Sequence, residues 1–234
     1  MKKRKKIKIA AFIFVRGGSK GIKNKNIIDF NGKPLLAWTI ELALRNKLID
    51  KVIVSTDSNK IAKIAKFYGA DVPFMRPKKL SKDNSPEWLA WQHALDYFQG
   101  QYSYLPEIFI SLPCTSPLRI SRDITKSINK FLNKKPDILI TITETNRNPW
   151  FNMVKISNNK VSLVNNSKNN ITRRQDAPKI YDMTTVAYVA NPNYILKNRS
   201  IFDGKVEALS LPKERAIDID DELDLFIAKK LFRR

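Results

Sequence analysis

The sequence predicts an α/β protein with a Rossmann-like, mostly parallel sheet, and three observations predict this class. Residues 7–15 form an apolar, β-branched run that is typical of a buried central strand. Short apolar strands and amphipathic helices then alternate to about residue 142, which is the pattern of βαβ units. A glycine-rich loop follows the first strand directly, at the position where open α/β sheets bind ligands.

The later elements follow from the spacing of apolar residues. Further strands are expected at residues 52–55, 108–112, 138–142, 185–190 and 206–209. Pro34 suits the first turn of a helix that runs to about residue 44, and Asp57 and Ser58 are cap candidates for a second helix. Helices are also expected at 86–98, 123–132 and 223–231. On the helix at 86–98, the apolar stripe expected to be buried consists of Trp88, Trp91, Ala94, Leu95 and Phe98. On the helix at 223–231, it consists of Leu223, Phe226, Ile227 and Leu231.

The alternation of strands and helices breaks after residue 142. Residues 143–180 are rich in asparagine and other polar residues, with scattered aromatic side chains at Trp150, Phe151 and Tyr181 just beyond. Because these aromatic side chains suggest packing against another surface, we interpret the stretch as an irregular arm or a small β subdomain rather than a linker. We therefore expect one domain over residues 1–234, with a dimerisation arm at about 143–185.

The composition excludes several classes of protein. The chain has 234 residues and is 43% hydrophobic, which is enough for a sizeable core. Its single cysteine, Cys114, and single histidine, His93, exclude a disulfide framework, a cysteine-rich zinc module and a His-rich metal site. Low cysteine content favours a reduced, cytoplasmic compartment. We expect no signal peptide and no membrane span, since no stretch approaches the ~20 apolar residues that a span needs.

The formal net charge of +21 has two interpretations. It indicates either a polyanionic partner, such as a nucleic acid, or lysine-rich surfaces that are simply solvated. The lysines are spread along the chain, and the sequence contains none of the usual nucleic-acid-reading motifs. We therefore favour diffuse surface charge and expect no nucleic-acid partner.

The loop after the first strand has the composition of an anion-binding site. Three of the chain's seven glycines, Gly17, Gly18 and Gly21, lie within five residues, and they allow backbone N–H groups to converge on an anion. Arg16, Lys20 and Lys25 add positive charge there. The loop matches neither the Walker motif nor the dinucleotide fingerprint, so a basic, flexible turn is the alternative interpretation.

An acidic pair near the C-terminus is a candidate metal site. In an extended chain, Asp218 and Asp220 lie on one face, with their Cα atoms ~6.5 Å apart, and Ile217 and Ile219 lie on the other. Mg²⁺ prefers a few carboxylates together with water and substrate phosphates. The alternative is helix capping, because acidic residues are common at helix N-termini, and Asp221, Glu222 and Asp224 are expected to do only that.

Two further loops carry polar side chains with less distinctive spacing. Thr115, Ser116 and Arg119 follow the 108–112 strand and are expected to face the same crevice as the glycine loop, although a plain connecting loop explains them equally well. Arg174, in the arm, suits carboxylate or phosphate recognition, with a solvated basic turn as the alternative. We expect Cys114 to be unreactive and His93 to be packed or on the surface.

Taken together, these motifs resemble the acylneuraminate cytidylyltransferase (CMP-sialic acid synthetase) family. The glycine loop is similar to that family's opening motif almost residue for residue, and the ordered matches extend over nearly the whole chain. The matching segments are residues 15–26, 53–57, 75–77, 80–83, 115–119, 174–176 and 217–220.

The resemblance implies a fold of the nucleotide-sugar transferase type, a homodimer, and CTP and a nine-carbon 2-keto sugar acid as substrates. The implied products are a CMP-sugar and pyrophosphate. The family pattern assigns the triphosphate to Arg16, Lys20 and Lys25, and Mg²⁺ to Asp218 and Asp220. It implies further nucleotide contacts from Gly17, Gly18, Ser19, Gly21, Asn26 and Arg76, with Asn26 reading the cytosine, and sugar-acid contacts from Thr115, Ser116, Arg119 and, across the dimer, Arg174.

The sequence departs from the family pattern mainly on the expected sugar side. Pro113 and Cys114 stand where the sialic acid enzymes usually have Gln-Pro, and Pro86-Glu87 interrupts a run that is usually rich in small hydroxyl residues. A relative of N-acetylneuraminate such as legionaminic or pseudaminic acid, or an eight-carbon ulosonic acid, therefore fits as well. A homologue that binds nucleotide without turnover and a basic nucleic-acid-binding protein are the other hypotheses.

Overall fold

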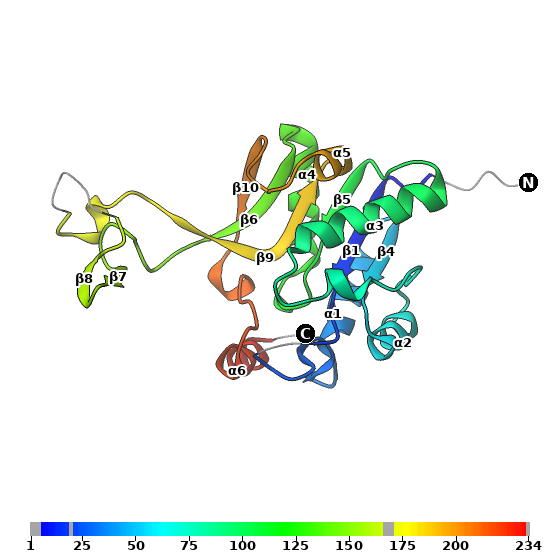
Figure 1. Cartoon of the computed structure of the whole chain (residues 1–234), viewed down its shortest axis with the longest axis horizontal. Coiled ribbons are helices and arrows are strands. Elements are labelled where there is room, and N and C mark those ends of the chain that lie inside the picture. Colours follow the sequence, from blue (N-terminus) through cyan, green and yellow to red (C-terminus); the bar gives the residue numbers. More distant parts are fainter. Residues whose placement is uncertain (1–5, 19–20, 166–170, 233–234) are drawn as a thin grey trace, which may run out of the picture.

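The computed structural model describes residues 6–18, 21–165 and 171–232, and its centre is a six-stranded sheet with the order β10-β6-β9-β5-β1-β4 (Figure 1). The strands are β1 (Ile9–Phe14), β4 (Lys51–Ser55), β5 (Ile108–Ser111), β6 (Ile138–Glu144), β9 (Tyr181–Ala190) and β10 (Val206–Ser210). β1 is parallel to β4 and β5, and β10 is parallel to β6, whereas β9 is antiparallel to both of its neighbours. The predicted mostly parallel α/β sheet is confirmed.

Helices cover both faces of the sheet, because alternate residues of each buried strand point to opposite sides. They are α1 (Leu35–Arg45), α2 (Asn59–Phe67), α3 (Glu87–Tyr102), α4 (Ser121–Lys134), α5 (Pro192–Lys197) and α6 (Glu222–Leu231). In β1, Ala11 and Ile13 pack in a core with residues of α1, α2 and α4, while Phe12 packs in a second core with residues of α3 and α5. The molecule is therefore a three-layer sandwich.

The predicted apolar stripe of α3 is confirmed, since all five of its residues are buried. The stripe predicted for α6 is wrong. Leu223 and Phe226 are 64% and 59% exposed, and Ile227 and Leu231 also face solvent. The helix instead buries Leu225 and Ala228 in a third, small core with Ile22 and Phe30. Only the face of α6 with Leu225 and Ala228 packs against this core, so the wider apolar stripe of the helix is exposed to solvent.

Residues after β6 form an arm that projects away from the sheet (Figure 1). The arm contains the hairpin of β7 (Val154–Ser157) and β8 (Lys160–Leu163) and the 3-10 turn η3 (Arg174–Asp176), and the long strand β9 leads back into the sheet. Connecting segments contain three further 3-10 turns, η1 (Lys25–Ile27), η2 (Lys78–Leu80) and η4 (Lys213–Arg215), and a small β2–β3 hairpin (Asp29–Phe30 and Lys33–Pro34).

A β-bulge marks the point where β9 passes from the arm into the core. The register between β6 and β9 shifts between Ile140 and Thr141. The buried Thr141 hydroxyl fills the irregularity: it accepts a hydrogen bond from the Ala187 N–H (3.1 Å) and lies 2.7 Å from the Thr184 hydroxyl. The side chain thus satisfies backbone polar groups that the interrupted ladder leaves unpaired.

Among the residues that the structure describes, no helix combines the length and apolarity needed to span a membrane.

We expect Thr141→Val to lower the free energy of unfolding by about 1–3 kcal/mol, because a buried N–H loses its acceptor while the side-chain volume is kept. Urea unfolding measures this change. Thr172→Val, at an exposed position of the arm, serves as the control and should change stability by less than about 0.5 kcal/mol. Equal effects of the two substitutions would contradict the role given to Thr141.

Candidate active site

A cleft of about 390 Å³ opens where β1 and β5 end. This is the carboxyl edge of the parallel strands, as expected for a ligand site in this class of sheet. Eight of the residues predicted from the sequence line it together: Arg16, Gly18, Gly21, Lys25, Asn26, Arg76, Thr115 and Asp220. Residues of the segment before α3, including Asp83, and Glu87 at the first position of α3 complete the wall. Of the remaining predictions, Ser19 and Lys20 lie outside the described residues.

The glycine loop is held from two sides. The Gly17 N–H donates to Asp57 Oδ1 (2.9 Å), and the Asn26 side-chain amide donates to the Arg16 carbonyl (3.0 Å). The Arg16 guanidinium forms an ion pair with Asp83 across the cleft. Asp57, predicted as a helix-cap candidate, therefore anchors the loop, while Ser58 caps α2 by accepting from the Ile61 N–H.

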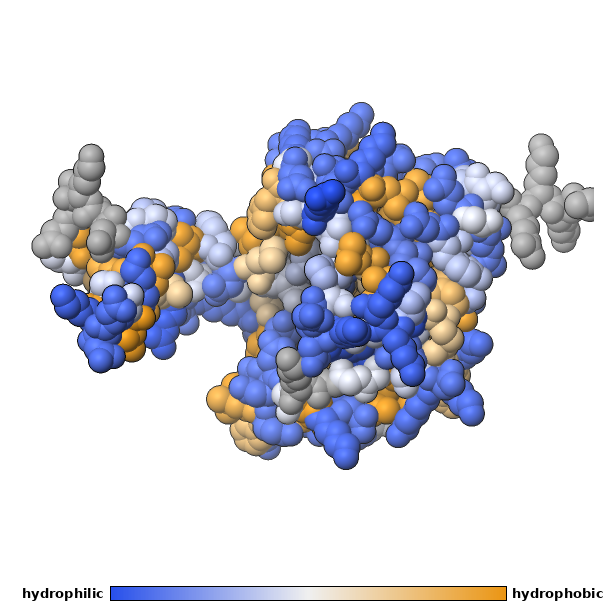
Figure 2. Space-filling model, in the orientation of Figure 1, coloured by the Kyte–Doolittle hydropathy of each residue, from blue (hydrophilic) through white to orange (hydrophobic). Residues whose placement is uncertain are grey.

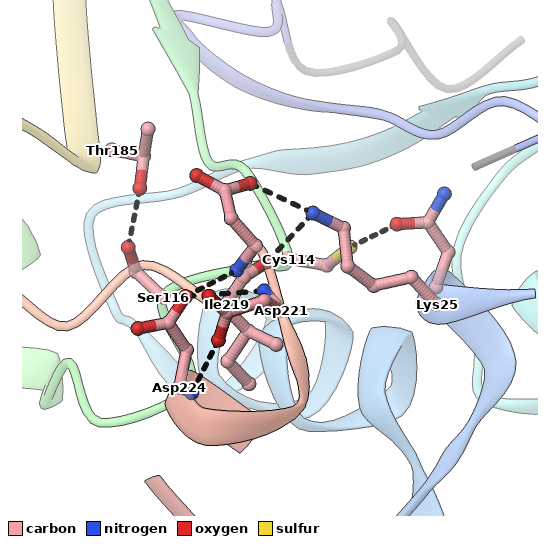
Figure 3. Close-up of polar contacts among 9 residues, drawn as sticks. Lys25, Cys114, Ser116, Thr185, Ile219, Asp221 and Asp224 are labelled. Atoms are coloured by element: carbon pink, nitrogen blue, oxygen red, sulfur yellow. Dashed lines mark hydrogen bonds and ion pairs between the residues drawn. The ribbon is translucent and has the colours of Figure 1, made fainter. Parts of the chain in front are cut away.

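Lys25 ties the glycine loop to the acidic C-terminal segment (Figure 3). Its ammonium donates to the Ile219 carbonyl (2.6 Å) and pairs with Asp220 Oδ1 (3.0 Å). Gly21 approaches the same segment so closely that a Cβ there would overlap the Asp220 carbonyl oxygen. The two motifs are almost 200 residues apart in sequence, and the structure places them on one cleft.

The acidic pair fits a divalent cation. Ile217 and Ile219 pack in the small core, as the alternation predicts, and the Ile219 N–H donates to the Thr115 carbonyl (2.8 Å). Asp218 Oδ1 is buried and has no hydrogen-bond partner among the described residues, and a buried carboxylate oxygen left in this way is costly. Asp220 is exposed beside it. The pair could supply two of the oxygens that Mg²⁺ takes alongside water and phosphates. Beyond the pair, the described residues contain no cluster of three or more His, Cys, Asp or Glu side chains.

The loop after β5 places some of its side chains in the cleft and others in the protein interior. Thr115 lines the cleft, but Ser116 and Arg119 are buried beneath it, where the structure gives no route to a substrate. The Ser116 hydroxyl lies 2.6 Å from that of Thr185 (Figure 3), and the Arg119 guanidinium donates to the carbonyls of Pro113, Ser116 and Thr185. The two residues predicted to contact substrate thus support the bulged part of β9.

Two charged side chains on the far wall of the cleft have shifted pKa values. Burial lowers the pKa of Arg76, while the charges of Asp57 and Glu87 raise it. Glu87 is open to the cleft, but the surrounding protein desolvates its carboxyl and raises its pKa, and the nearby Asp218 adds to the rise. A hydrogen bond from Trp91 Nε1 (2.8 Å) and the charge of Arg76 act in the opposite direction.

Arg174 lies away from this cleft. It lines a groove of about 340 Å³ at the base of the arm, with Glu144 and Arg147, and donates to the Thr145 carbonyl (3.3 Å). Within one chain, the structure does not bring Arg174 to the other predicted site residues. Its predicted contact with a sugar acid therefore requires a second subunit.

Several residues that shape the site are not among the predicted site residues: Asp57, Asp83, Glu87 and Cys114. Asp83 carried a signal, since it belongs to a segment that matches the family pattern, but its ion-pair partner Arg16 is 67 residues away. Glu87 was noted only as a departure from that pattern. Asp57 likewise belongs to a matching segment, residues 53–57, whereas no local signal marks the contact of Cys114, because that contact depends on the tertiary fold.

The sheet topology and the cleft together define an α/β protein that binds its ligand beyond the carboxyl ends of its parallel strands. Residues 10–208 match the family model described as cytidylyltransferase, so the chain belongs to the cytidylyltransferase family.

Curated relatives match over almost their full lengths. The chain is 39% identical to the CMP-N,N'-diacetyllegionaminic acid synthase of Campylobacter jejuni, with 95% of this chain and 94% of the relative covered. It is 37% identical to the post-translational flagellin modification protein B of Campylobacter coli, with 96% of this chain and 95% of the relative covered. It is 33% identical to a pseudaminic acid cytidylyltransferase of Campylobacter jejuni, with 97% of each covered.

Solved structures confirm the fold. The structure of a CMP:2-keto-3-deoxy-manno-octonic acid synthetase complexed with CTP has a TM-score of 0.69, at 15% identity, with 96% of this chain and 98% of that chain covered. A 4-diphosphocytidyl-2C-methyl-D-erythritol synthase from Anaerococcus prevotii has a TM-score of 0.67, at 16% identity, with 97% of each covered.

We expect Gly21→Ala to destabilise the protein by about 1–3 kcal/mol, because the added Cβ must push the loop and the Asp220 backbone apart. Gly18→Ala is the matched control in the same loop, since its Cβ would meet nothing within 4 Å, and it should change stability by about 0.5 kcal/mol or less. Urea unfolding of both variants tests the close approach, and equal midpoints for the two would refute it.

Proposed function

We propose that the protein couples CTP to a sialic-acid-like nonulosonic acid, giving the CMP-sugar and pyrophosphate. The observation that carries this proposal is the contact of Lys25 and Gly21 with the Asp220 segment, since it sets a cationic loop against the Asp220 carboxylate on one cleft, with the buried Asp218 carboxylate two residues away. Membership of the cytidylyltransferase family supports CTP as the nucleotide.

In this proposal the residues of the cleft act by positioning and by charge neutralisation. Arg16 and Lys25, with Lys20, bind the triphosphate, and Arg76 lies against the nucleotide. The anomeric oxygen of the sugar attacks the α-phosphorus, the bond to the β-phosphate breaks, and pyrophosphate leaves. Mg²⁺ held by Asp218 and Asp220 would neutralise charge on the phosphate oxygens. Of the carboxyls that line the cleft, Glu87 has a pKa raised in the direction that suits acceptance of the hydroxyl proton.

The choice of a nine-carbon acid rests on the relatives. The relatives given above at 39% and 33% identity are named for legionaminic and pseudaminic acid, and an N-acylneuraminate cytidylyltransferase of Escherichia coli is 32% identical, with 94% of this chain and 51% of the relative covered. The fold is shared with an enzyme for an eight-carbon acid, at lower identity. We therefore rank the nonulosonic acids first and the eight-carbon acid second.

We also propose that the arm forms a homodimer. In the β7–β8 hairpin, Val154 lies opposite Leu163 and Ile156 opposite Val161, so one face is entirely aliphatic. Val154, Ile156 and Val161 are 59–73% exposed, and apolar side chains are visible on the projecting arm (Figure 2). Because an isolated two-stranded hairpin is marginal in water, a second copy of the chain that covers this face would stabilise it.

We further propose a cytoplasmic location, on the basis of the low cysteine content.

We expect pyrophosphate release to require CTP, Mg²⁺ and a nonulosonic acid when these are screened in a panel that includes an eight-carbon ulosonic acid. Asp218→Asn should lower turnover on the order of 10²-fold or more, because the charge opposite the triphosphate is lost. Glu222→Gln, an exposed change at the start of α6, is the control and should leave turnover unchanged. No release with any acid of the panel would count against the proposed reaction.

We expect the protein to sediment as a dimer and Ile156→Glu to sediment as a monomer, because the new charge would be buried in the aliphatic interface. Lys155→Glu, one residue away on the polar face of the same hairpin, should remain dimeric. Analytical ultracentrifugation separates these outcomes, and a wild-type monomer at micromolar concentration would exclude the arm as a stable interface.

A further inference from the structure

Cys114 makes a specific polar contact beneath the glycine loop. Its thiol donates to Asn26 Oδ1 across 3.0 Å (Figure 3), and both side chains are buried, with exposures of 2% and 9%. At its other end, the Asn26 amide donates from Nδ2 to the Arg16 carbonyl (3.0 Å). The three residues form a chain of two hydrogen bonds from the loop after β5 to the loop after β1.

The thiol and the Arg16 carbonyl together fix which way the Asn26 amide faces. Burial raises the pKa of Cys114 to about 12, with Asp218 adding to the rise and Arg119 and Lys25 opposing it. The sulfur therefore keeps its proton at neutral pH and remains a donor. If the Asn26 amide were flipped, its NH₂ would face the thiol, which is a weaker hydrogen-bond acceptor than a carbonyl oxygen. Its own oxygen would then face the Arg16 carbonyl oxygen, and two acceptors would meet with no proton between them.

The Arg16 carbonyl matters because Arg16 begins the glycine loop. The neighbouring Gly17 N–H is held by Asp57, and the Arg16 guanidinium reaches into the cleft. An anchor on the Arg16 backbone thus sets where the loop starts and where its guanidinium lies. In the family pattern that this loop resembles, proline stands at the position of Cys114, and a proline has no side-chain donor.

We propose that Cys114 is a positioning residue for the nucleotide loop: by orienting Asn26 it fixes the Arg16 backbone and thereby strengthens CTP binding. This inference rests on the proposed function of the cleft. A side chain that acts through the loop should affect the affinity for CTP more than the rate of bond formation. A residue that merely fills space should instead lower stability without that selectivity.

The test uses the full chain at saturating sugar acid, with KM for CTP, kcat and the thermal midpoint measured for each variant. Cys114→Ala should raise KM for CTP about three- to tenfold, the effect of one lost hydrogen bond, and leave kcat within about twofold. Cys114→Ser keeps a donor and should recover most of the affinity. Ser127→Ala removes a buried hydroxyl from α4, whose bond to the Asp123 carbonyl is 2.9 Å, and should lower stability without changing KM for CTP.

A double-substitution cycle makes the test decisive. If Cys114 acts through Asn26, Cys114→Ala should have no further effect on KM for CTP once Asn26→Ala is present. Additive effects of the two substitutions, or an unchanged KM in Cys114→Ala, would overturn the proposal. The proposal would also be overturned if KM for CTP rose in both Cys114→Ala and Ser127→Ala in proportion to the loss of thermal stability in each.

The failure of this inference is distinguishable from failure of the proposed reaction. If the wild-type protein turns over no acid of the panel, calorimetry of CTP binding alone compares the wild type with Cys114→Ala. A weaker binding constant in the variant then supports the positioning role even though the reaction is wrong. Equal constants, or no CTP binding by the wild type, overturn it.

Discussion

The attachment of Lys25 to the C-terminal segment is the constraint on which the cleft depends. Lys25 is the only described side chain that bonds both the Ile219 backbone and the Asp220 carboxylate, and the absence of a side chain at Gly21 lets the two backbones meet. The segment is held on its other side by the Thr115 carbonyl. Three loops from the two ends and the middle of the chain therefore share one junction, which holds the acidic pair in place together with the packing of Ile217 and Ile219.

Beneath this junction, the floor of the cleft is unusually polar for a protein interior. Arg119 is fully buried and donates to three backbone carbonyls, and Thr141 and Ser116 supply hydroxyls on either side of the bulge in β9. Burying such groups is tolerable only when their hydrogen bonds are made. The bulge and the loop after β5 thus stabilise each other through a hydroxyl and an arginine, Ser116 and Arg119, that the sequence also offers as candidate substrate contacts.

Much of the fold is predictable from the sequence because it is encoded locally. The apolar run of β1, the α3 stripe from Trp88 to Phe98 and the Ile217–Ile219 alternation all correspond to buried surfaces. The α6 stripe failed because periodicity shows that a helix has an apolar face but not whether anything covers it. The same distinction applies to the site. The glycine loop and the acidic pair are contiguous motifs that can be recognised in the sequence. The pairing of Arg16 with Asp83 and of Cys114 with Asn26 depends instead on the tertiary fold.

The arm is not a separate module on a flexible tether, because its two stems are the strands β6 and β9, which pair from Glu144 and Tyr181 at the arm to Ile138 and Ala190 in the sheet. The β7–β8 hairpin lies beyond this ladder, so the ladder and the bulge at Thr141 fix the base of the arm relative to the sheet. In a dimer joined through such arms, the length of paired β6 and β9 would set how far the base of each arm stands from its own sheet, and the connecting residues beyond Glu144 would set the spacing between the two subunits.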